Sequence, residues 1–203
     1  MVSKFWSDTT LEPKRQFKFL FVIPAPEGTQ AVESYLVKQV AKPQFQLGET
    51  KVNYIQHTFK YPGRLTWQDI SVTLIDTIRT DDTSSRLANI LRASGYVIPD
   101  TATNAQFSFT KQGSANALNS PYIQQIDGGN PANNIAPRVV EQWNLRNAWV
   151  KSVNFGTLNY NSDELVDITL GISYDWAEYF TVGASGGVSE DSANGLMPLP
   201  QES

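Results

Sequence analysis

The chain has 203 residues, of which 40% are hydrophobic, 11% aromatic and 18% charged, so it can fill one sizeable core or two small ones. Its formal net charge of -4 argues against a protein that grips nucleic acid by neutralising phosphates. The absence of cysteine excludes a disulfide framework and a thiolate site, and it fits a cytosolic or virion protein. The longest apolar run, residues 19–23, is far shorter than the ~20 residues of a membrane-spanning helix.

The first half of the chain has the alternating pattern of strands. Residues 16–23 alternate between apolar and other side chains, and prolines follow them, which predicts a strand. A second strand is predicted over residues 35–40, and the polar, weakly periodic stretch from Lys42 to Lys51 is predicted to be a loop. Residues 52–61 and 65–76 are extended segments joined by Pro62-Gly63, a pair typical of turns, so they predict a hairpin.

One short amphipathic helix is predicted next. The polar residues 81–84 can cap free amides, Leu87, Ile90 and Leu91 follow at helical spacing, and Gly95 stands where a left-handed residue would end the helix. We expect this helix to lie on a sheet.

Residues 96–137 are rich in Asn, Gln, Ala, Ser, Gly and Pro and have no strong periodicity. We interpret them as an inserted loop with a small hairpin around residues 106–111. Residues 141–153 are predicted to form a strand. The clearest alternation follows over 166–176, which predicts a strand with one apolar and one polar face.

Together these elements predict a mainly β fold, a β-sandwich or barrel of antiparallel strands with one short α-helix. We predict a single domain over residues 1–180 with the insertion at 96–137. Residues 181–203 are predicted to be a mobile C-terminal tail, because their Gly-rich, acidic and Pro-containing composition buries little apolar surface.

Few residues offer catalytic chemistry. His57 is the only histidine, so a triad or zinc site would depend on it alone; a plain strand histidine is the commoner situation. We find no phosphate-binding glycine loop, nucleophile elbow or calcium loop. Neighbouring carboxylates at 81–82 and 163–164 are explained by helix capping and turn chemistry. We therefore expect no enzyme activity, no cofactor and no metal.

Several segments resemble the tail tube proteins of contractile-tailed bacteriophages (the myovirus tail tube family). They are QFKFLF (16–21), YIQHTF (54–59), TWQDISVTLID (66–76) and the long stretch 143–176 that closes on YDW. The resemblance covers about residues 14–95 and 138–180. It implies a two-sheet β subunit that assembles into stacked hexameric rings around a β-barrel lumen.

The resemblance also implies the partners and place of the protein. The subunit would contact copies of itself, the tail sheath, the baseplate and the tape-measure protein. Double-stranded DNA would pass through the tube during genome ejection without specific binding. The protein would be a structural component of the virion tail, assembled in the host cytoplasm.

The resemblance implies two sets of candidate functional residues. A polar strand face is predicted to line the lumen, with an outer solvent-facing wall as the alternative; its residues are Asp69, Ser71, Thr73, Asp167, Thr169 and Ser173. By analogy with the long inter-strand loop of the family, residues 42–51 are predicted to contact the next ring through Phe45 and Leu47.

Other functions fit the same sequence features. A baseplate tube-initiator or an injection-system tube protein could have the same domain. From a different class, a carbohydrate-binding β-sandwich could use Trp67, Trp143, Trp149 and Trp176 as a stacking platform, although large residues at strand parity more often lie in a core or interface.

Overall fold

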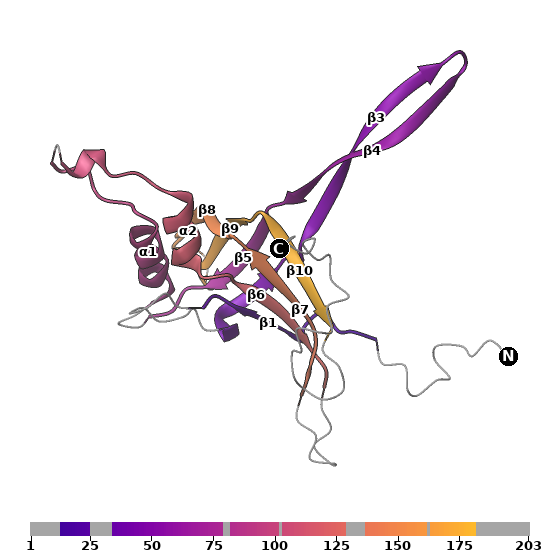
Figure 1. Cartoon of the computed structure of the whole chain (residues 1–203). Coiled ribbons are helices and arrows are strands. Elements are labelled where there is room, and N and C mark those ends of the chain that lie inside the picture. Colours follow the sequence, from indigo (N-terminus) through magenta and orange to yellow (C-terminus); the bar gives the residue numbers. More distant parts are fainter. Residues whose placement is uncertain are drawn as a thin grey trace, which may run out of the picture.

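The computed structural model describes residues 13–24, 34–78, 82–101, 103–128, 137–161 and 163–181. Two four-stranded antiparallel sheets form its body (Figure 1). Sheet 1 has the order β1 (Phe19–Val22), β6 (Tyr122–Ile126), β7 (Val139–Arg146) and β10 (Trp176–Thr181). Sheet 2 has the order β2 (Val37–Val40), β5 (Ile70–Ile75), β9 (Asp167–Ser173) and β8 (Trp149–Asn154), and the short 3-10 helix η1 (Ser34–Leu36) precedes β2. The prediction of a mainly β, antiparallel fold is confirmed.

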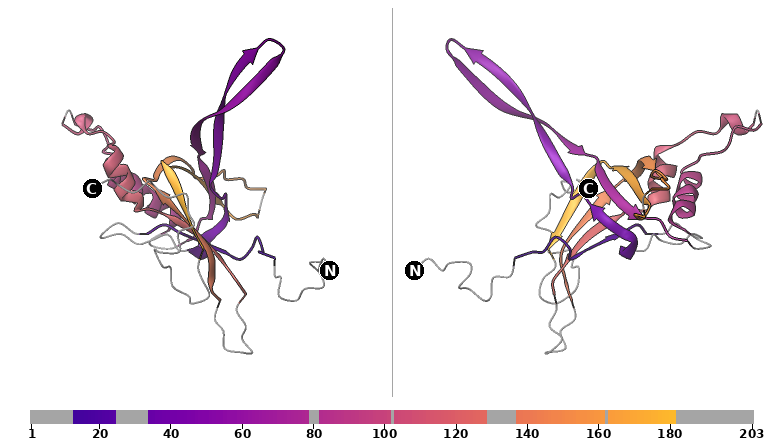
Figure 2. Two further views of the ribbon diagram at one scale, coloured as in Figure 1. Left: turned by 45° about the vertical axis from the view of Figure 1, so that its right-hand side comes forward. Right: turned by 180° about the vertical axis from the view of Figure 1, so that it is seen from behind.

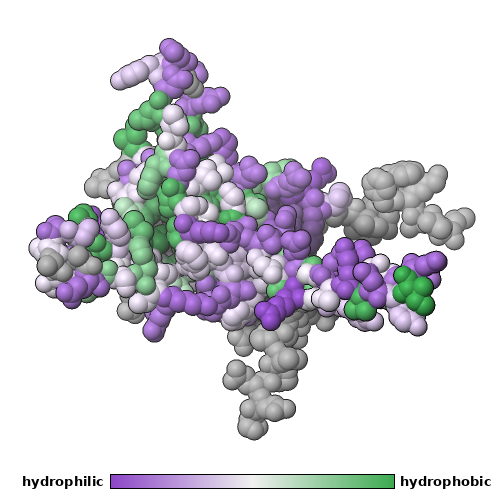
Figure 3. Space-filling model, turned by 90° about the horizontal axis from the view of Figure 1, so that it is seen from above, coloured by the Kyte–Doolittle hydropathy of each residue, from purple (hydrophilic) through white to green (hydrophobic). Residues whose placement is uncertain are grey.

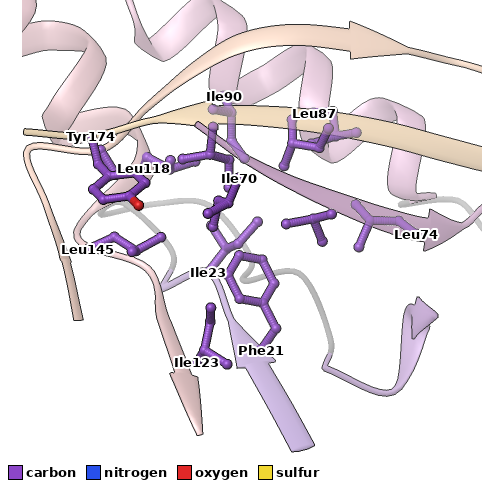
Figure 4. Close-up of a cluster of buried hydrophobic side chains, with 14 of the residues drawn as sticks. Phe21, Ile23, Ile70, Leu74, Leu87, Ile90, Leu118, Ile123, Leu145 and Tyr174 are labelled. Atoms are coloured by element: carbon purple, nitrogen blue, oxygen red, sulfur yellow. The ribbon is translucent and has the colours of Figure 1, made fainter. Parts of the chain in front are cut away.

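The core lies between the two sheets (Figure 4). Because side chains alternate across a strand, β5 and β9 each send every second residue inward. The buried residues of these strands are Ile70, Val72, Leu74, Ile168, Leu170 and Ile172. Phe21, Ile123 and Leu145 of sheet 1 meet them from the other side. Burying each such side chain contributes about 1.5–3 kcal/mol, so this core is the main source of stability.

Two of the predicted strands each contain a passage from one sheet to the other. Residues 141–153 form two strands, because Asn147 adopts a positive φ of 52° between β7 in sheet 1 and β8 in sheet 2. In the same way the predicted strand 166–176 ends at Ser173, and β10 begins in sheet 1 at Trp176. A simple alternating pattern runs on through such a corner, so it does not reveal the change of sheet.

The predicted helix is present as α1 (Thr83–Ala93). The Asp82 carboxylate accepts a hydrogen bond from the Ser85 backbone N–H at 2.7 Å, and Gly95 has a φ of 105° just beyond the end. These are the start and stop that the sequence predicted. Leu87 and Ile90 are buried, whereas Leu91 is exposed on the helix surface.

Residues 96–137 contain more regular structure than an inserted loop. The expected hairpin near 106–111 is wrong: this part holds the 3-10 helix η2 (Asn104–Gln106) and the start of a second helix, α2 (Lys111–Leu118). Strand β6 follows and is an inner strand of sheet 1, so this segment supplies part of the core. The single-domain boundary stays a prediction, and the predicted tail lies almost wholly outside the described residues.

A long hairpin projects from the body, and we call it the arm (Figures 1 and 2). It consists of β3 (Gln44–Tyr54) and β4 (His57–Gln68), which pair only with each other. The loop predicted over 42–51 is therefore wrong, because most of it belongs to β3. The predicted turn at Pro62-Gly63 is also wrong: both residues lie inside β4, and the chain reverses at residues 55–56.

Pro62 and Gly63 form an irregularity in the ribbon instead of a turn. The register shifts at this point, so that β4 has one more residue than β3 between the pairs Leu47–Leu65 and Glu49–Pro62. Proline, which lacks a backbone N–H, is tolerated at such a bulge. A Cβ on Gly63 would lie only 3.0 Å from the Gly48 carbonyl oxygen, which explains why glycine is needed there.

Candidate functional site on the arm and the polar sheet face

The six residues predicted to line a lumen come together on one face of sheet 2. Ser71 lies opposite Gly171, and Thr73 lies directly opposite Thr169 on β9. Asp69 and Ser173 interact by a side-chain hydrogen bond just beyond the ends of this ladder. We call this outward surface, defined by Asp69, Ser71, Thr73, Asp167, Thr169 and Ser173, the polar face. Its assignment to a lumen stays a prediction.

The polar face carries balanced charge, because each of its carboxylates has a lysine partner. Lys151 Nζ lies 2.5 Å from Asp69 Oδ2, and Lys38 Nζ lies 2.6 Å from Asp167 Oδ2. The hydrogen bonds from Lys151 and Ser173 lower the pKa of Asp69. The sequence alone did not point to either lysine. Lys38 is placed by the pairing of β2 with β5, since β5 in turn pairs with β9, which carries Asp167. The face therefore offers hydroxyls and neutralised ion pairs with no surplus of positive charge.

The base of the arm packs on the body through aromatic rings. Trp67 of β4 lies between Phe45 of β3, with ring centroids 5.5 Å apart, and Tyr174 of the body, 5.9 Å away. Burial is the main reason that the pKa of Tyr174 rises to about 12, so its ring stays neutral over the ordinary pH range. Phe45, a predicted ring-stacking residue, thus contacts its own subunit while remaining half exposed.

Beyond the bulge, the arm has one apolar and one polar face. Val52 pairs with Phe59 and Thr50 with Tyr61, whereas Lys51 pairs with Lys60 on the opposite face. Both lysines contact Glu49, at 2.9 and 3.4 Å. We call the apolar side, formed by Val52, Tyr54, Phe59 and Tyr61, the distal arm face; each of these side chains is about half exposed or more. Figure 3 shows hydrophobic atoms near the end of the arm, at the right of the view.

A buried carboxylate ties the base of the arm to sheet 1. Glu141 of β7 has a side chain only 6% exposed, and it forms ion pairs with both Lys14 and Lys42. Burial alone would raise the pKa of Glu141, but the two lysines outweigh it and hold this pKa below its ordinary value of 4.5. Lys42 also donates to the Gln125 side chain of β6 at 2.8 Å.

This pair network gives stability that depends on pH. Because the pKa of Glu141 is lowered on folding, its contribution is complete above about pH 4.5 and is lost as the pH falls through the folded-state pKa. We expect Glu141→Gln to lower the free energy of unfolding by about 1–2 kcal/mol at pH 7, and this difference should shrink below pH 4. Urea titrations of both proteins at several pH values measure it; a difference independent of pH would contradict the assignment.

A hollow of about 590 Å³ lies beside the two helices. Leu91 of α1, Phe109 and Trp149 of β8 give it apolar walls, and the ion pair between Lys111 and Asp175, at 2.6 Å, closes one side. The hydrogen bond from Lys111 is the main cause that lowers the pKa of Asp175. The charged side chains of its lining, Lys111, Lys151 and Asp175, are already in ion pairs, so the opening would receive an apolar side chain more readily than a charged one.

The four tryptophans considered as a sugar platform lie in separate places. Trp67 sits at the base of the arm, and Trp143 packs on Tyr179 with ring centroids 4.8 Å apart. Trp149 lines the hollow beside the helices, and Trp176 donates a hydrogen bond to Glu178 at 3.2 Å. They therefore do not combine into one stacking surface.

His57 lies at the end of the arm, paired with Tyr54 and with its ring 6.5 Å from that of Phe59. Within the described segments, no three His, Asp or Glu side chains gather as metal ligands would. No helix in the same segments has both the length and the apolar character of a membrane span.

Comparison with known proteins identifies the fold. No family model and no curated protein matches the sequence. A chain of the 6-fold symmetrised anti-feeding prophage (AFP) baseplate superposes with a TM-score of 0.58 at 11% identity, covering 84% of this chain and 97% of that chain. A chain of the PVC extracellular contractile injection system, in its extended sheath/tube terminator, gives 0.53 at 13% identity, covering 83% and 96%. A chain of the extended PVC sheath-tube complex gives 0.53 at 14% identity, covering 84% and 93%.

These matches define the class of fold. The chain has the β-rich fold of structural components from contractile injection particles. The identities, all below 15%, explain why the likeness is visible in three dimensions and not in the sequence comparisons.

Proposed function

We propose that the chain is the structural subunit of a phage tail tube, which assembles itself into stacked hexameric rings and forms the conduit for genome delivery. The arm is the observation that carries this proposal. A two-stranded ribbon is marginally stable by itself in water, and the distal arm face leaves four large apolar side chains exposed. A neighbouring copy would cover them. The fold shared with baseplate and sheath-tube components supports the same conclusion.

The contact between rings would involve the arm. Leu47 lies opposite Leu65 on an exposed part of the ribbon, and Phe45 is nearer the base. Both residues keep their proposed role in ring stacking. The distal arm face, whose β3 residues Val52 and Tyr54 have the opposite strand parity to Phe45 and Leu47, would offer a second contact surface farther from the body. Head-to-tail contacts of this kind, in which an arm meets a different surface of the next copy, build rings and stacks.

The polar face would line the conduit. Its paired carboxylates and lysines give it no excess positive charge, so it would not hold passing phosphates. Transient passage of double-stranded DNA without specific binding fits this chemistry. In the assembled tail, the tube would also contact the sheath, the baseplate and the tape-measure protein, and the completed virion would form in the host cytoplasm.

Reversing one charge on the polar face should therefore slow genome passage. Asp167→Lys would remove the partner of Lys38 and add a second positive charge beside it in every copy. We expect tubes to assemble normally, because the residue lies at the start of β9 on the outward face, while DNA release slows. Ejection timed by a DNA-binding dye measures this. An unchanged ejection rate in Asp167→Lys particles would refute the assignment of this face to the lumen.

A baseplate tube-initiator or an injection-system tube protein is the second candidate. The match to a chain of the AFP baseplate favours it, since an initiator could share the fold and differ in copy number and partners. The carbohydrate-binding alternative receives less support, because the four tryptophans are spread over separate parts of the structure.

Electron microscopy of the purified protein tests the proposal. Negative-stain images at high protein concentration, with light scattering on the same sample, should show six-fold rings or hollow tubes. Monomers that persist after addition of a cognate baseplate would overturn it. Rings that form without stacking into tubes would favour the initiator.

A further inference from the structure

We propose that Glu141 is a positioning residue, which fixes the direction in which the arm leaves the body by holding Lys42 against sheet 1. This role rests on the proposed function, because in a tube the arm of every subunit must reach the same surface of its neighbour. The positioning itself belongs to the single subunit and can be measured without any assembly.

Both strands of the arm are connected to sheet 2. On the incoming side, β2 ends at Val40, and the Ala41 backbone N–H still donates to the Ser71 carbonyl oxygen at 3.0 Å. On the returning side, β4 ends at Gln68 and β5 begins at Ile70, with only Asp69 between them. A ribbon joined to one sheet by two short connections could swing about them, since a few backbone angles at element ends are enough for a hinge.

Glu141 supplies the contact with the other layer. It lies on β7, an inner strand of sheet 1, and its carboxylate meets the ammonium group of Lys42, two residues before β3 begins. Gln125 of β6 accepts a second hydrogen bond from the same ammonium group. Because a buried carboxylate is costly to leave without a partner, Glu141 keeps Lys42 in place.

The aromatic contact on the returning strand restrains the arm in another direction. Trp67 lies against Tyr174, whose side chain is buried in the body. One contact would leave the arm free to rotate about it. Two contacts, on different strands and against different residues of the body, remove that freedom. The arm would therefore be set before it meets a partner, which lowers the entropy lost on association.

The chain provides a matched control for this idea. Lys14 binds the same carboxylate as Lys42, and the two lysine side chains are 47% and 50% exposed. Lys14 precedes β1 and is not connected to the arm. Removing either lysine leaves one ion pair on Glu141, so the electrostatic loss is similar. Of the two lysines, only Lys42 connects the carboxylate to the arm, so only its loss removes a restraint on the arm.

Distance measurements on the dilute subunit test the proposal. The chain has no cysteine, so Gln56→Cys at the end of the arm and Ala88→Cys on α1 can carry spin labels without background. Double electron-electron resonance should give a narrow distance distribution for the labelled parent. We expect Lys42→Met and Glu141→Gln to broaden this distribution at least twofold, and Lys14→Met to leave it unchanged. Thermal unfolding of all variants verifies that the body stays folded.

Two results would overturn the proposal. The first is an unchanged distribution in folded Lys42→Met, which would show that other contacts fix the arm. The second is equal broadening in Lys14→Met and Lys42→Met, which would show a general loosening around Glu141. Neither result depends on tube formation. If the distance measurements contradict the positioning role, the proposed tube function is unaffected. If the unlabelled protein forms no tubes, the positioning role is unaffected.

Discussion

The double substitution Phe59→Thr and Tyr61→Thr is expected to abolish tube formation while leaving the folded subunit intact. Both residues belong to the distal arm face and are half exposed, so the core does not depend on them. Threonine keeps the strand preference of the positions and removes most of the apolar surface. Residues at the energetic centre of a protein interface, where tyrosine is enriched, contribute about 2 kcal/mol or more each, and a tube repeats the loss at every subunit.

The opposite face of the same strand provides the control for this experiment. Thr58→Ser with Lys60→Thr changes two neighbouring residues on the polar side of the arm, where the ion pair between Lys60 and Glu49 is exposed and contributes little. We expect tubes of ordinary length from this variant. Tube length distributions from negative-stain images compare the two. Full-length tubes from the Phe59 and Tyr61 variant would remove the distal arm face from the stacking contact.

The substitution Leu170→Ala is expected to have the largest effect on stability. Leu170 has no exposed surface and lies on β9 between Val72 of β5 and Val153 of β8. Truncating a fully buried leucine removes its transfer free energy and leaves a cavity, which together cost about 2–5 kcal/mol. For a chain of this size the unfolding temperature should fall by about 4 °C or more.

An exposed leucine serves as the comparison for this prediction. Leu158, which is 84% exposed, loses the same atoms on substitution by alanine but leaves no cavity in the described core. The unfolding temperature of the Leu158→Ala variant should differ from that of the parent by less than about 1 °C. Thermal unfolding followed by circular dichroism compares the two variants. Equal shifts would mean that the packing between the sheets is not the source of stability.

The arm shows why the sequence reading placed a turn wrongly. Pro62-Gly63 has the composition of a turn, yet the turn is made by Ile55 and Gln56, with Ile55 at a positive φ of 53°. A β-branched residue is uncommon in that conformation, so composition pointed to the wrong pair. Every residue of β3 is exposed. A strand that buries neither face does not need regular alternation of apolar and polar residues, which is the pattern that identifies a strand in a sequence.

The two helices differ in how clearly the sequence marks their ends. α1 has Asp82 before it, Gly95 after it and a stripe of Leu87 and Ile90 that reaches the core, so its sequence was sufficient. α2 has comparable caps, since Thr110 accepts a hydrogen bond from the Gly113 backbone N–H and Asn119 is left-handed. Glycine and small polar residues inside it hid these caps.

The polar face could be predicted as a set, because strict alternation in β5 and β9 places its residues on one side. Its charge balance could not. Lys38 and Lys151 come from β2 and β8, at the two edges of the sheet, and only the strand order shows which residues they meet. The role of Glu141 was hidden for the same reason, since it joins segments far apart in the sequence.

The near-continuity of β4 and β5 has a mechanical consequence. A pull on the arm passes through Asp69 into β5, an inner strand that is paired with β2 on one side and β9 on the other. Tension along the strand would have to shear both sets of backbone hydrogen bonds at once, instead of opening them one after another from an end. A load applied at the tip of the arm is therefore carried by the strongest part of the subunit.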